Sequence, residues 1–239
     1  MARWGDDFSR WEKSPGNPVS EIDLEIDKLL RTRLSALIPD AAWLSEETAD
    51  NHERLSAARL WVVDPIDGTR DYLRGRPGWS VSIALVECGV PVIGVLDAPA
   101  RDEHWVAIRG EGATRNGALL TAGKRTVLKG ARWPTDAVPD TAVDLVAVDK
   151  PNSIALRIGM VAADEADLVA TLRWGYEWDL AAAALIATEA GATISDAFGE
   201  PLAFNTPSAQ AFGVLATTQG IHRAAVARVR DRALALSAA

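Results

Sequence analysis

Residues 61–69 read WVVDPIDGT, a short apolar run followed at once by two carboxylates in a turn-forming sequence. The apolar run predicts a buried strand. Pro65 and Gly68 predict that the chain turns where this run ends. Such a turn can hold Asp64 and Asp67 rigidly while it leaves coordination positions open, which suits a hard divalent cation such as Mg²⁺. The alternative is an ordinary Asp-rich β-turn in which Asp64 only caps the turn.

The end of the same stretch is suited to an anion. Gly68 and Thr69 would present backbone N–H groups, and these groups favour a phosphate where a helix or a turn of amides begins. Mg²⁺ is commonly bound by a few carboxylates together with a substrate phosphate. The stretch therefore favours a phosphorylated ligand beside the two carboxylates.

The hydrophobic pattern outside this stretch predicts a mixture of helices and strands. Ser20 and Asp23 form a capping-box pattern ahead of a helix whose apolar residues recur until Pro39. Further strands are predicted at 81–86, 92–96, 104–108, 144–148, 192–195 and 212–216. Further helices are predicted at 154–163, 178–190 and 221–236. Short turns between the strands of the first half imply an antiparallel sheet, and the lack of a regular βαβ alternation implies a layered α+β fold.

Composition narrows the function classes. The 239 residues carry 25 Lys+Arg and 33 Asp+Glu, a formal charge of −8, which argues against broad binding to nucleic acid or anionic lipid. One Cys and three His exclude a disulfide framework and a zinc site built on several thiolates, and they leave oxygen atoms as the expected metal ligands. The N-terminus lacks the apolar stretch of a secretory signal and no apolar run is long enough for a membrane span, so we expect a cytoplasmic protein.

Three further carboxylates stand in suggestive positions. Asp179 opens the Ala-rich helix predicted at 178–190, where a plain helix-capping role explains it equally well. Glu46 and Glu47 lie in the sequence LSEET, residues 44–48, which a solvated loop or a helix start explains. Each segment taken alone favours these ordinary interpretations.

Taken together, the segments resemble the inositol monophosphatase superfamily of Mg²⁺-dependent, lithium-sensitive phosphatases. The matching motifs are LSEET at 44–48, WVVDPIDGT at 61–69, WDLAA at 178–182 and EAG at 189–191. The resemblance covers roughly residues 13–217. It implies an αβαβα sandwich that forms one phosphatase domain over 1–239, with an N-terminal α+β half at about 1–130, a C-terminal α/β half at about 140–239, and the metal site between them.

The resemblance also implies roles for individual residues. Glu46, Asp64 and the backbone carbonyl of Ile66 would hold one Mg²⁺, and Asp64 would bridge to a second ion completed by Asp67 and Asp179. A third, weaker ion near Glu46 occurs in some relatives. In such a centre one ion makes a better nucleophile of water and the other stabilises the leaving oxygen.

The catalytic and substrate-binding residues follow from the same resemblance. Glu46 and Thr69 would orient and deprotonate the attacking water, with Asp67 beside them. The substrate would contact Asp67, Gly68, Thr69, Glu177 and Arg157. Asp23 would support the metal site without binding the ion itself. Its alternative role is in the capping box alone, and the two roles are compatible.

Three features favour a 3'(2'),5'-bisphosphate nucleotidase acting on adenosine 3',5'-bisphosphate. They are the Glu-Trp-Asp string at 177–179, the sequence TRDYL at 69–73, and Arg157. Arg157 stands at what resembles the position of a Lys in these nucleotidases. Solvated helix positions for Arg70 and Arg157 are the alternative. The shortened segment before Lys13 and the altered sequence at 148–154 depart from the family pattern.

The alternatives are an inositol-1-phosphate or histidinol-phosphate phosphatase, and a regulatory protein-binding role. The resemblance further implies inhibition by Li⁺ and a homodimer. The expected partner is a small phosphorylated substrate, and neither a nucleic acid polymer nor a membrane is expected.

Overall fold

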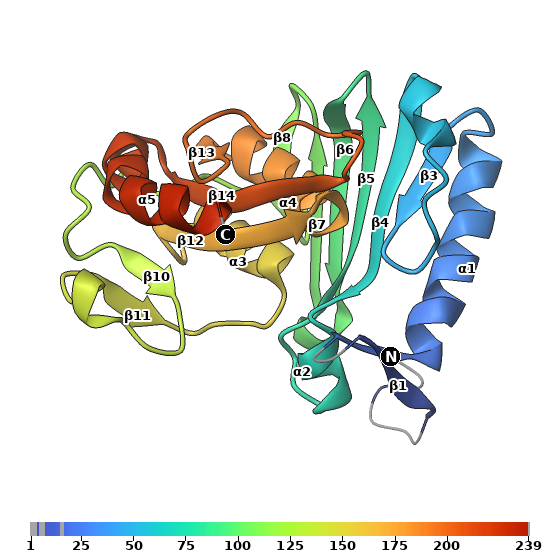
Figure 1. Ribbon diagram of the computed structural model, residues 1–239, viewed down its shortest axis with the longest axis horizontal. Coiled ribbons are helices and arrows are strands. Elements are labelled where there is room, and N and C mark those ends of the chain that lie inside the picture. The colour runs from blue at the N-terminus through green and yellow to red at the C-terminus, as the bar shows by residue number, and fades with distance from the viewer. Residues whose placement is uncertain (1–3, 5–7, 15–16, 239) are drawn as a thin grey trace.

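The computed structural model describes residue 4, residues 8–14 and residues 17–238, and in this part of the chain the largest sheet has seven strands in sequence order (Figure 1). The strands are β3 (Ala42–Ser45), β4 (Arg59–Asp67), β5 (Ser80–Glu87), β6 (Val90–Ala98), β7 (Glu103–Ile108), β8 (Gly112–Arg115) and β9 (Ala118–Leu119). β3 and β4 are parallel and every other neighbouring pair is antiparallel. The sheet is therefore mixed, whereas the short turns alone predicted an antiparallel one.

A second sheet lies in the C-terminal half. It has the order β12-β14-β13, with β12 (Leu168–Tyr176) and β13 (Ala192–Ser195) antiparallel to β14 (Gln210–Thr218). A short parallel pair, β10 (Arg132–Pro134) and β11 (Val146–Val148), flanks it, and β11 lies within the strand predicted at 144–148. The first described strands, β1 (Arg10–Ser14) and β2 (Asn17–Ser20), form a hairpin before the first helix.

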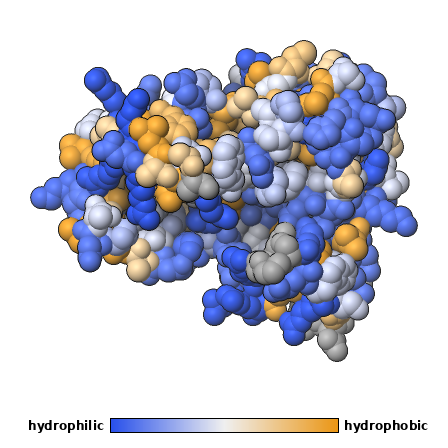
Figure 2. Space-filling model, viewed as in Figure 1, coloured by the Kyte–Doolittle hydropathy of each residue, from blue (hydrophilic) through white to orange (hydrophobic). Residues whose placement is uncertain are grey.

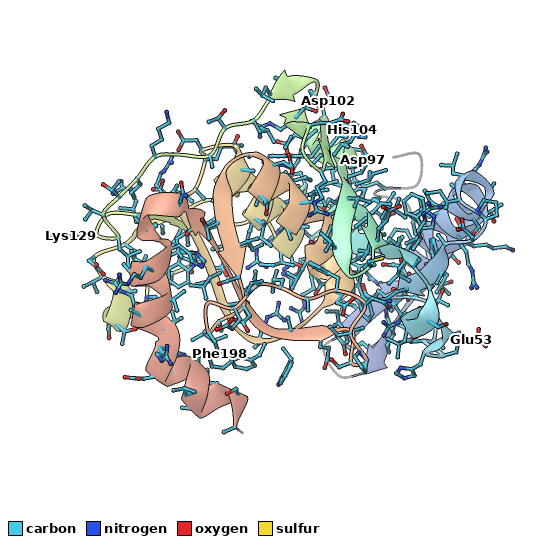
Figure 3. The ribbon with its side chains drawn as sticks, turned by 90° about the horizontal axis from the view of Figure 1, so that it is seen from above. Glu53, Asp97, Asp102, His104, Lys129 and Phe198 are labelled. Atoms are coloured by element: carbon cyan, nitrogen blue, oxygen red, sulfur yellow. The ribbon has the colours of Figure 1, made fainter. Side chains whose placement is uncertain are left out.

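Helices separate and cover the two sheets, so the molecule has five layers (Figure 3). The helices are α1 (Glu21–Leu37), α2 (Thr69–Leu73), α3 (Ile154–Ala162), α4 (Glu177–Glu189) and α5 (His222–Ser237). α1 packs on one face of the large sheet, α3 and α4 fill the space between the sheets, and α5 covers the outer face of the small sheet. This is the expected αβαβα sandwich.

The sequence of α4 explains its central place. Leu180 to Ala187 are all buried, and a helix that is apolar on every side is stable only when protein surrounds it. α1 instead carries exposed residues such as Leu29 beside inward-facing ones, as suits an outer layer. The face shown in Figure 2 is mostly hydrophilic, with scattered apolar patches.

The observed strands differ from the predicted ones at β4 and at β12, among other places. The strand predicted to end at Val63 continues as β4 to Asp67, because a bulge lies where Pro65 interrupts the ladder: Asp64 pairs with Ser82 and Asp67 with Ser80. A bulge tolerates a residue that has no N–H to donate. The strand β12 had no counterpart among the predicted elements. None of the described helices has the length and apolar character needed to cross a membrane.

Candidate metal centre

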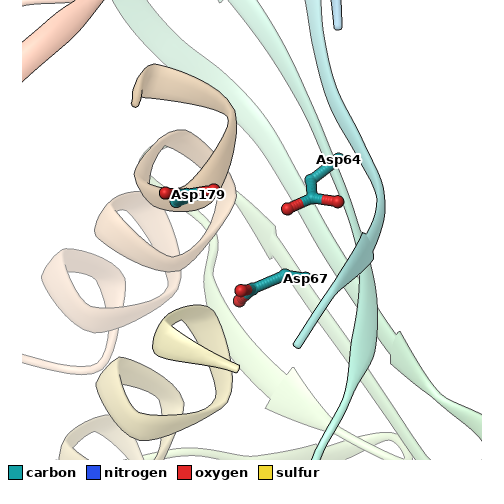
Figure 4. Close-up of side chains that lie close together, drawn as sticks. All are labelled: Asp64, Asp67 and Asp179. Atoms are coloured by element: carbon teal, nitrogen blue, oxygen red, sulfur yellow. The ribbon is translucent and has the colours of Figure 1, made fainter. Parts of the chain in front are cut away.

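Asp64, Asp67 and Asp179 come together between β4 and α4 (Figure 4). Each offers a carboxylate oxygen, and these three atoms lie within 4.8 Å of one another. Asp64 and Asp67 are buried, with exposed fractions of 1% and 7%, and Asp179 is half-buried at the start of α4. Two segments more than a hundred residues apart thus build one acidic cluster.

The bulge in β4 explains how both aspartates of the DPID sequence reach this cluster. Residues three apart in a regular strand point to opposite faces of the sheet. Between Asp64 and Asp67 the strand contains one residue more than the facing segment of β5, which reverses that alternation. Both carboxylates therefore face α4. Asp64 also accepts a hydrogen bond from the N–H of Ile66 at 2.8 Å, which fixes the bulge.

Burial and mutual repulsion raise the pKa values of the clustered carboxyl groups. Burial raises the pKa of Asp64 well above its usual value, and the charges of Glu46, Asp67 and Asp179 raise it further. Burial, with the charges of Asp67 and Glu46, raises the pKa of Asp179 to about 8. In the described residues no basic side chain lies within salt-bridge distance of the three aspartates. The charge of Arg157 lowers the pKa of Asp67 and that of Arg173 lowers the pKa of Asp179, and both effects are smaller than that of burial. An all-oxygen donor set of three carboxylates fits a hard divalent cation.

Asp67 also caps α3. Its Oδ2 accepts hydrogen bonds from the Ser153 hydroxyl at 2.5 Å and from the Ala155 N–H at 2.8 Å, and Oδ1 accepts one from the Ile154 N–H at 3.3 Å. Burial raises the pKa of Asp67, and these hydrogen bonds oppose the rise. The N-terminus of α3, where amide groups favour an anion, thus adjoins the acidic cluster.

Ile66 and Thr69 lie at the turn that follows. The Thr69 hydroxyl donates to the Ile66 carbonyl at 3.0 Å. Gly68 lies between Asp67 and Thr69, has a φ of +94° and is the N-cap residue of α2. The predicted carbonyl ligand and the predicted water-orienting hydroxyl are therefore hydrogen-bonded to each other.

Glu46 lies outside the cluster of three aspartates, although its charge raises the pKa of Asp64 and of Asp179. Its backbone N–H donates to the Val63 carbonyl at 3.3 Å, next to Asp64, but its carboxylate accepts from Lys13 Nζ at 3.0 Å. Lys13 also donates to Glu47 at 2.7 Å, and burial raises the pKa of Glu47 to about 7 against the opposing effect of Lys13. Sequence reasoning gave Lys13 no role, because nothing local indicates that the β1–β2 hairpin returns to the 44–48 segment.

The remaining predicted residues have partners within the protein. Glu177 is buried, and its carboxylate accepts hydrogen bonds from the Asn205 N–H and from the N–H and hydroxyl of Thr206. Arg157 donates to the carbonyls of Asn152 and Ser153. These bonds fix neighbouring loops, and a substrate contact by Glu177 or Arg157 stays a prediction.

Asp23 forms the capping box that the sequence indicated. Its Oδ2 accepts from the Ser20 N–H at 2.8 Å and from the Ser20 hydroxyl at 2.5 Å. Burial raises the pKa of Asp23, and the charge of Glu46 adds to this rise, so the two carboxylates are near each other. Its support of a metal site stays a prediction.

Comparison with known proteins agrees with this geometry. Residues 1–234 match the profile of the inositol monophosphatase family. The chain is 36% identical over 200 residues to a Streptomyces griseus protein named glucose-1-phosphate thymidylyltransferase, covering 78% of this chain and 76% of that one. It is 32% identical to a Thermotoga maritima fructose-1,6-bisphosphatase/inositol-1-monophosphatase, covering 84% and 80%.

Two further relatives widen the range of named activities. The chain is 35% identical to the Nus factor SuhB of Xylella fastidiosa, covering 77% of this chain and 71% of that one. It is 33% identical to a histidinol-phosphatase of Streptomyces coelicolor, covering 77% and 75%. Among solved structures, a Thermotoga maritima inositol monophosphatase superposes with a TM-score of 0.82 at 27% identity, covering 99% of this chain and 92% of that one. With its five-layered fold and its acidic cluster, this chain belongs to the inositol monophosphatase family of metal-dependent phosphatases and acts on small phosphorylated substrates.

Proposed function

We propose that this phosphatase hydrolyses its phosphomonoester with Mg²⁺ held by Glu46, Asp64, Asp67, Asp179 and the carbonyl of Ile66. The observation that carries the proposal is the set of three aspartates within 4.8 Å of one another, without an ion pair in the described residues. Bound Mg²⁺ supplies Lewis-acid chemistry, which lowers the pKa of water and stabilises charge on the leaving oxygen. Two ions are expected, with a third, weaker one near Glu46, and Li⁺ is expected to inhibit.

The protein's own groups would orient the reactants. The Thr69 hydroxyl donates to the Ile66 carbonyl, so its oxygen is free to accept a hydrogen bond from the attacking water and orient it. Glu46 would accept the proton that this water loses. The amides of Gly68 and Thr69 would hold phosphate oxygens. The first amides of α3 already donate to Asp67 and to the Ser153 hydroxyl.

Three phosphomonoesters are candidate substrates. The names of relatives favour inositol phosphates and histidinol phosphate. The string at 177–179 and Arg157 favour adenosine 3',5'-bisphosphate, but both Glu177 and Arg157 already bond to protein groups. We therefore place inositol 1-phosphate and histidinol phosphate ahead of the bisphosphate nucleotide.

A substrate panel tests the proposal. Phosphate release would be measured from inositol 1-phosphate, histidinol phosphate, adenosine 3',5'-bisphosphate and fructose 1,6-bisphosphate, each with Mg²⁺, with EDTA, and with Mg²⁺ plus Li⁺. We expect release only with Mg²⁺, a decrease with Li⁺, and the highest kcat/KM with one of the first two substrates. Activity that persists in EDTA would contradict the metal-dependent mechanism, and a preference for the nucleotide would reverse the substrate order.

A regulatory role is the second candidate, because one relative is named as a Nus factor. A stoichiometric protein partner in a pull-down, together with no phosphatase activity on any substrate, would favour it. We also propose that the chain works as one domain with halves at about 1–130 and 140–239, as a homodimer in the cytoplasm. Sedimentation of the purified chain tests the dimer.

A further inference from the structure

Asp27 on α1 is a buried carboxylate that the proposed mechanism does not use. Its exposed fraction is 8%. Oδ1 accepts a hydrogen bond from the Ser45 hydroxyl at 2.5 Å, and Oδ2 accepts one from the Thr48 hydroxyl at 2.9 Å. Among the described residues no basic side chain lies within salt-bridge distance of it. A buried charge is costly unless hydrogen bonds satisfy it, so these two bonds are the main compensation for its burial.

The two hydroxyls stand on either side of the Glu46–Glu47 pair. Ser45 precedes the pair and Thr48 follows it, so one carboxylate on α1 holds both ends of the turn. The Ser45 hydroxyl also accepts a hydrogen bond from the N–H of Glu47 at 3.3 Å. Asp27 therefore fixes the turn through side chains, in addition to the backbone bond from Glu46 to β4.

The backbone around Glu46 is less firmly held than that around the three aspartates. Asp64 and Asp67 are fixed by a central strand of the large sheet, and Asp179 by the first turn of a buried helix. Glu46 instead follows the end of β3, an edge strand whose one neighbour among the described strands is β4. A ligand on a turn is positioned only as well as the groups that hold the turn.

We propose that Asp27 is a positioning residue that holds Glu46 for metal binding, through its hydrogen bonds to Ser45 and Thr48. This inference rests on the proposed function, since it requires that Glu46 is a metal ligand. The two oxygens of a carboxylate accept hydrogen bonds from both hydroxyls. The oxygen of an amide accepts one of these hydrogen bonds, and its nitrogen must donate to the other hydroxyl. Asp27→Asn therefore keeps the shape of the side chain but removes one acceptor.

The test measures metal binding directly and uses the full chain. Mn²⁺ serves as the probe, and its free concentration is followed by electron paramagnetic resonance. Loss of a group that orients a metal ligand weakens binding by about 10–100-fold. We expect Asp27→Asn to weaken the Glu46-dependent ion by about 10-fold or more, and Ser45→Ala and Thr48→Val to weaken it in the same direction. Thr32→Val, which removes a hydroxyl that bonds only to the Lys28 carbonyl on the exposed side of α1, is the control and should leave binding unchanged.

A double-mutant cycle with Glu46→Gln separates positioning from a general effect on the fold. If Asp27 acts through Glu46, the combined variant binds Mn²⁺ no more weakly than Glu46→Gln alone, whereas independent effects would multiply. Unchanged binding in Asp27→Asn and Thr48→Val, or multiplying losses, would overturn the inference. Thr48→Val alone carries the test if Asp27→Asn does not fold. Unchanged binding in Glu46→Gln would instead contradict the ligand role of Glu46, and so the proposed function itself.

Discussion

Gly68 directly follows Asp67, a proposed metal ligand, and its own amide is a proposed phosphate-binding group. Its φ of +94° lies in the left-handed region, and a Cβ atom there would lie 2.8 Å from both the Gly78 carbonyl and the Ser153 N–H nitrogen. These are backbone atoms, which cannot rotate away. Gly68 therefore satisfies two separate constraints, one of conformation and one of space.

Gly68→Ala is expected to destabilise the protein by roughly 2–5 kcal/mol, because a left-handed conformation costs about 1–2 kcal/mol and overpacking adds about 1–3 kcal/mol. Gly75→Ala is the matched control, since Gly75 has a φ of +64° but no atom within 4 Å of the added Cβ. We expect it to cost about 1 kcal/mol. Urea unfolding of both variants checks the difference, and equal losses would show that space at Gly68 does not matter.

At this scale the sequence could indicate which carboxylates matter but not all of their partners. The strand-and-turn pattern alone indicates Asp64 and Asp67 as candidate ligands, whereas Asp179 is indicated only by the resemblance to a family. The contacts Lys13–Glu46 and Asp27–Ser45 join residues 33 and 18 positions apart, and they form only because the β1–β2 hairpin and α1 fold back on β3. Such contacts cannot be predicted from the spacing of residues within one segment.

The junction of β4 and α3 is the element-scale feature that places the site. Ser153 is the N-cap of α3: its hydroxyl accepts from the Leu156 N–H at 2.9 Å and donates to Asp67. One hydroxyl thus caps the helix and ties its N-terminus to the end of the strand.

Ser153→Ala is therefore expected to destabilise the protein by about 1–2 kcal/mol, since it removes an N-cap and a buried hydrogen bond to a carboxylate. Thr188→Ala is the control, because that exposed hydroxyl bonds only to the Ala184 carbonyl in the same helix and its loss should cost less than about 0.5 kcal/mol. Urea unfolding measures both. Equal effects would mean that the junction adds nothing to stability.

Elements with a clear period could be predicted, and interrupted ones could not. α1, α3, α4 and α5 all lie close to their predicted ranges, since apolar positions or Ala-rich runs mark them. β12 has no clear alternation because its first residues are buried on both faces, its register shifts between Thr171 and Trp174, and its last residues are exposed. The bulge of β4 could not be predicted either, because its sequence is typical of a turn.

The whole molecule carries the energetic cost of an acidic cluster in its interior. The folded state raises the pKa of Asp179 to about 8, whereas in the unfolded chain this carboxyl titrates near 3.8. Between these values the folded state binds more protons than the unfolded one, so the free energy of unfolding falls as pH rises. Mg²⁺ binding would offset this loss, because it requires the ionised carboxylates.

In EDTA, wild type is therefore expected to lose stability relative to Asp179→Asn as pH rises from about 5 to about 8. With saturating Mg²⁺ the wild-type loss should disappear. Thermal unfolding at several pH values, with EDTA and with Mg²⁺, provides the measurement. The comparison with Asp179→Asn removes the contributions of groups such as His222, whose pKa burial lowers. A wild type that gains stability over the variant as pH rises would contradict the assigned electrostatics.

The central claim is that the carboxylates between the two sheets form the metal centre that cleaves the phosphomonoester. Its most direct test is phosphate release by wild type and Asp64→Asn at saturating Mg²⁺, on the best substrate of the panel, with circular dichroism to verify the fold. Because metal stabilisation of the transition state contributes several kcal/mol, we predict a loss of roughly 10³-fold with the fold retained. Turnover near that of wild type in a folded Asp64→Asn protein would contradict the claim.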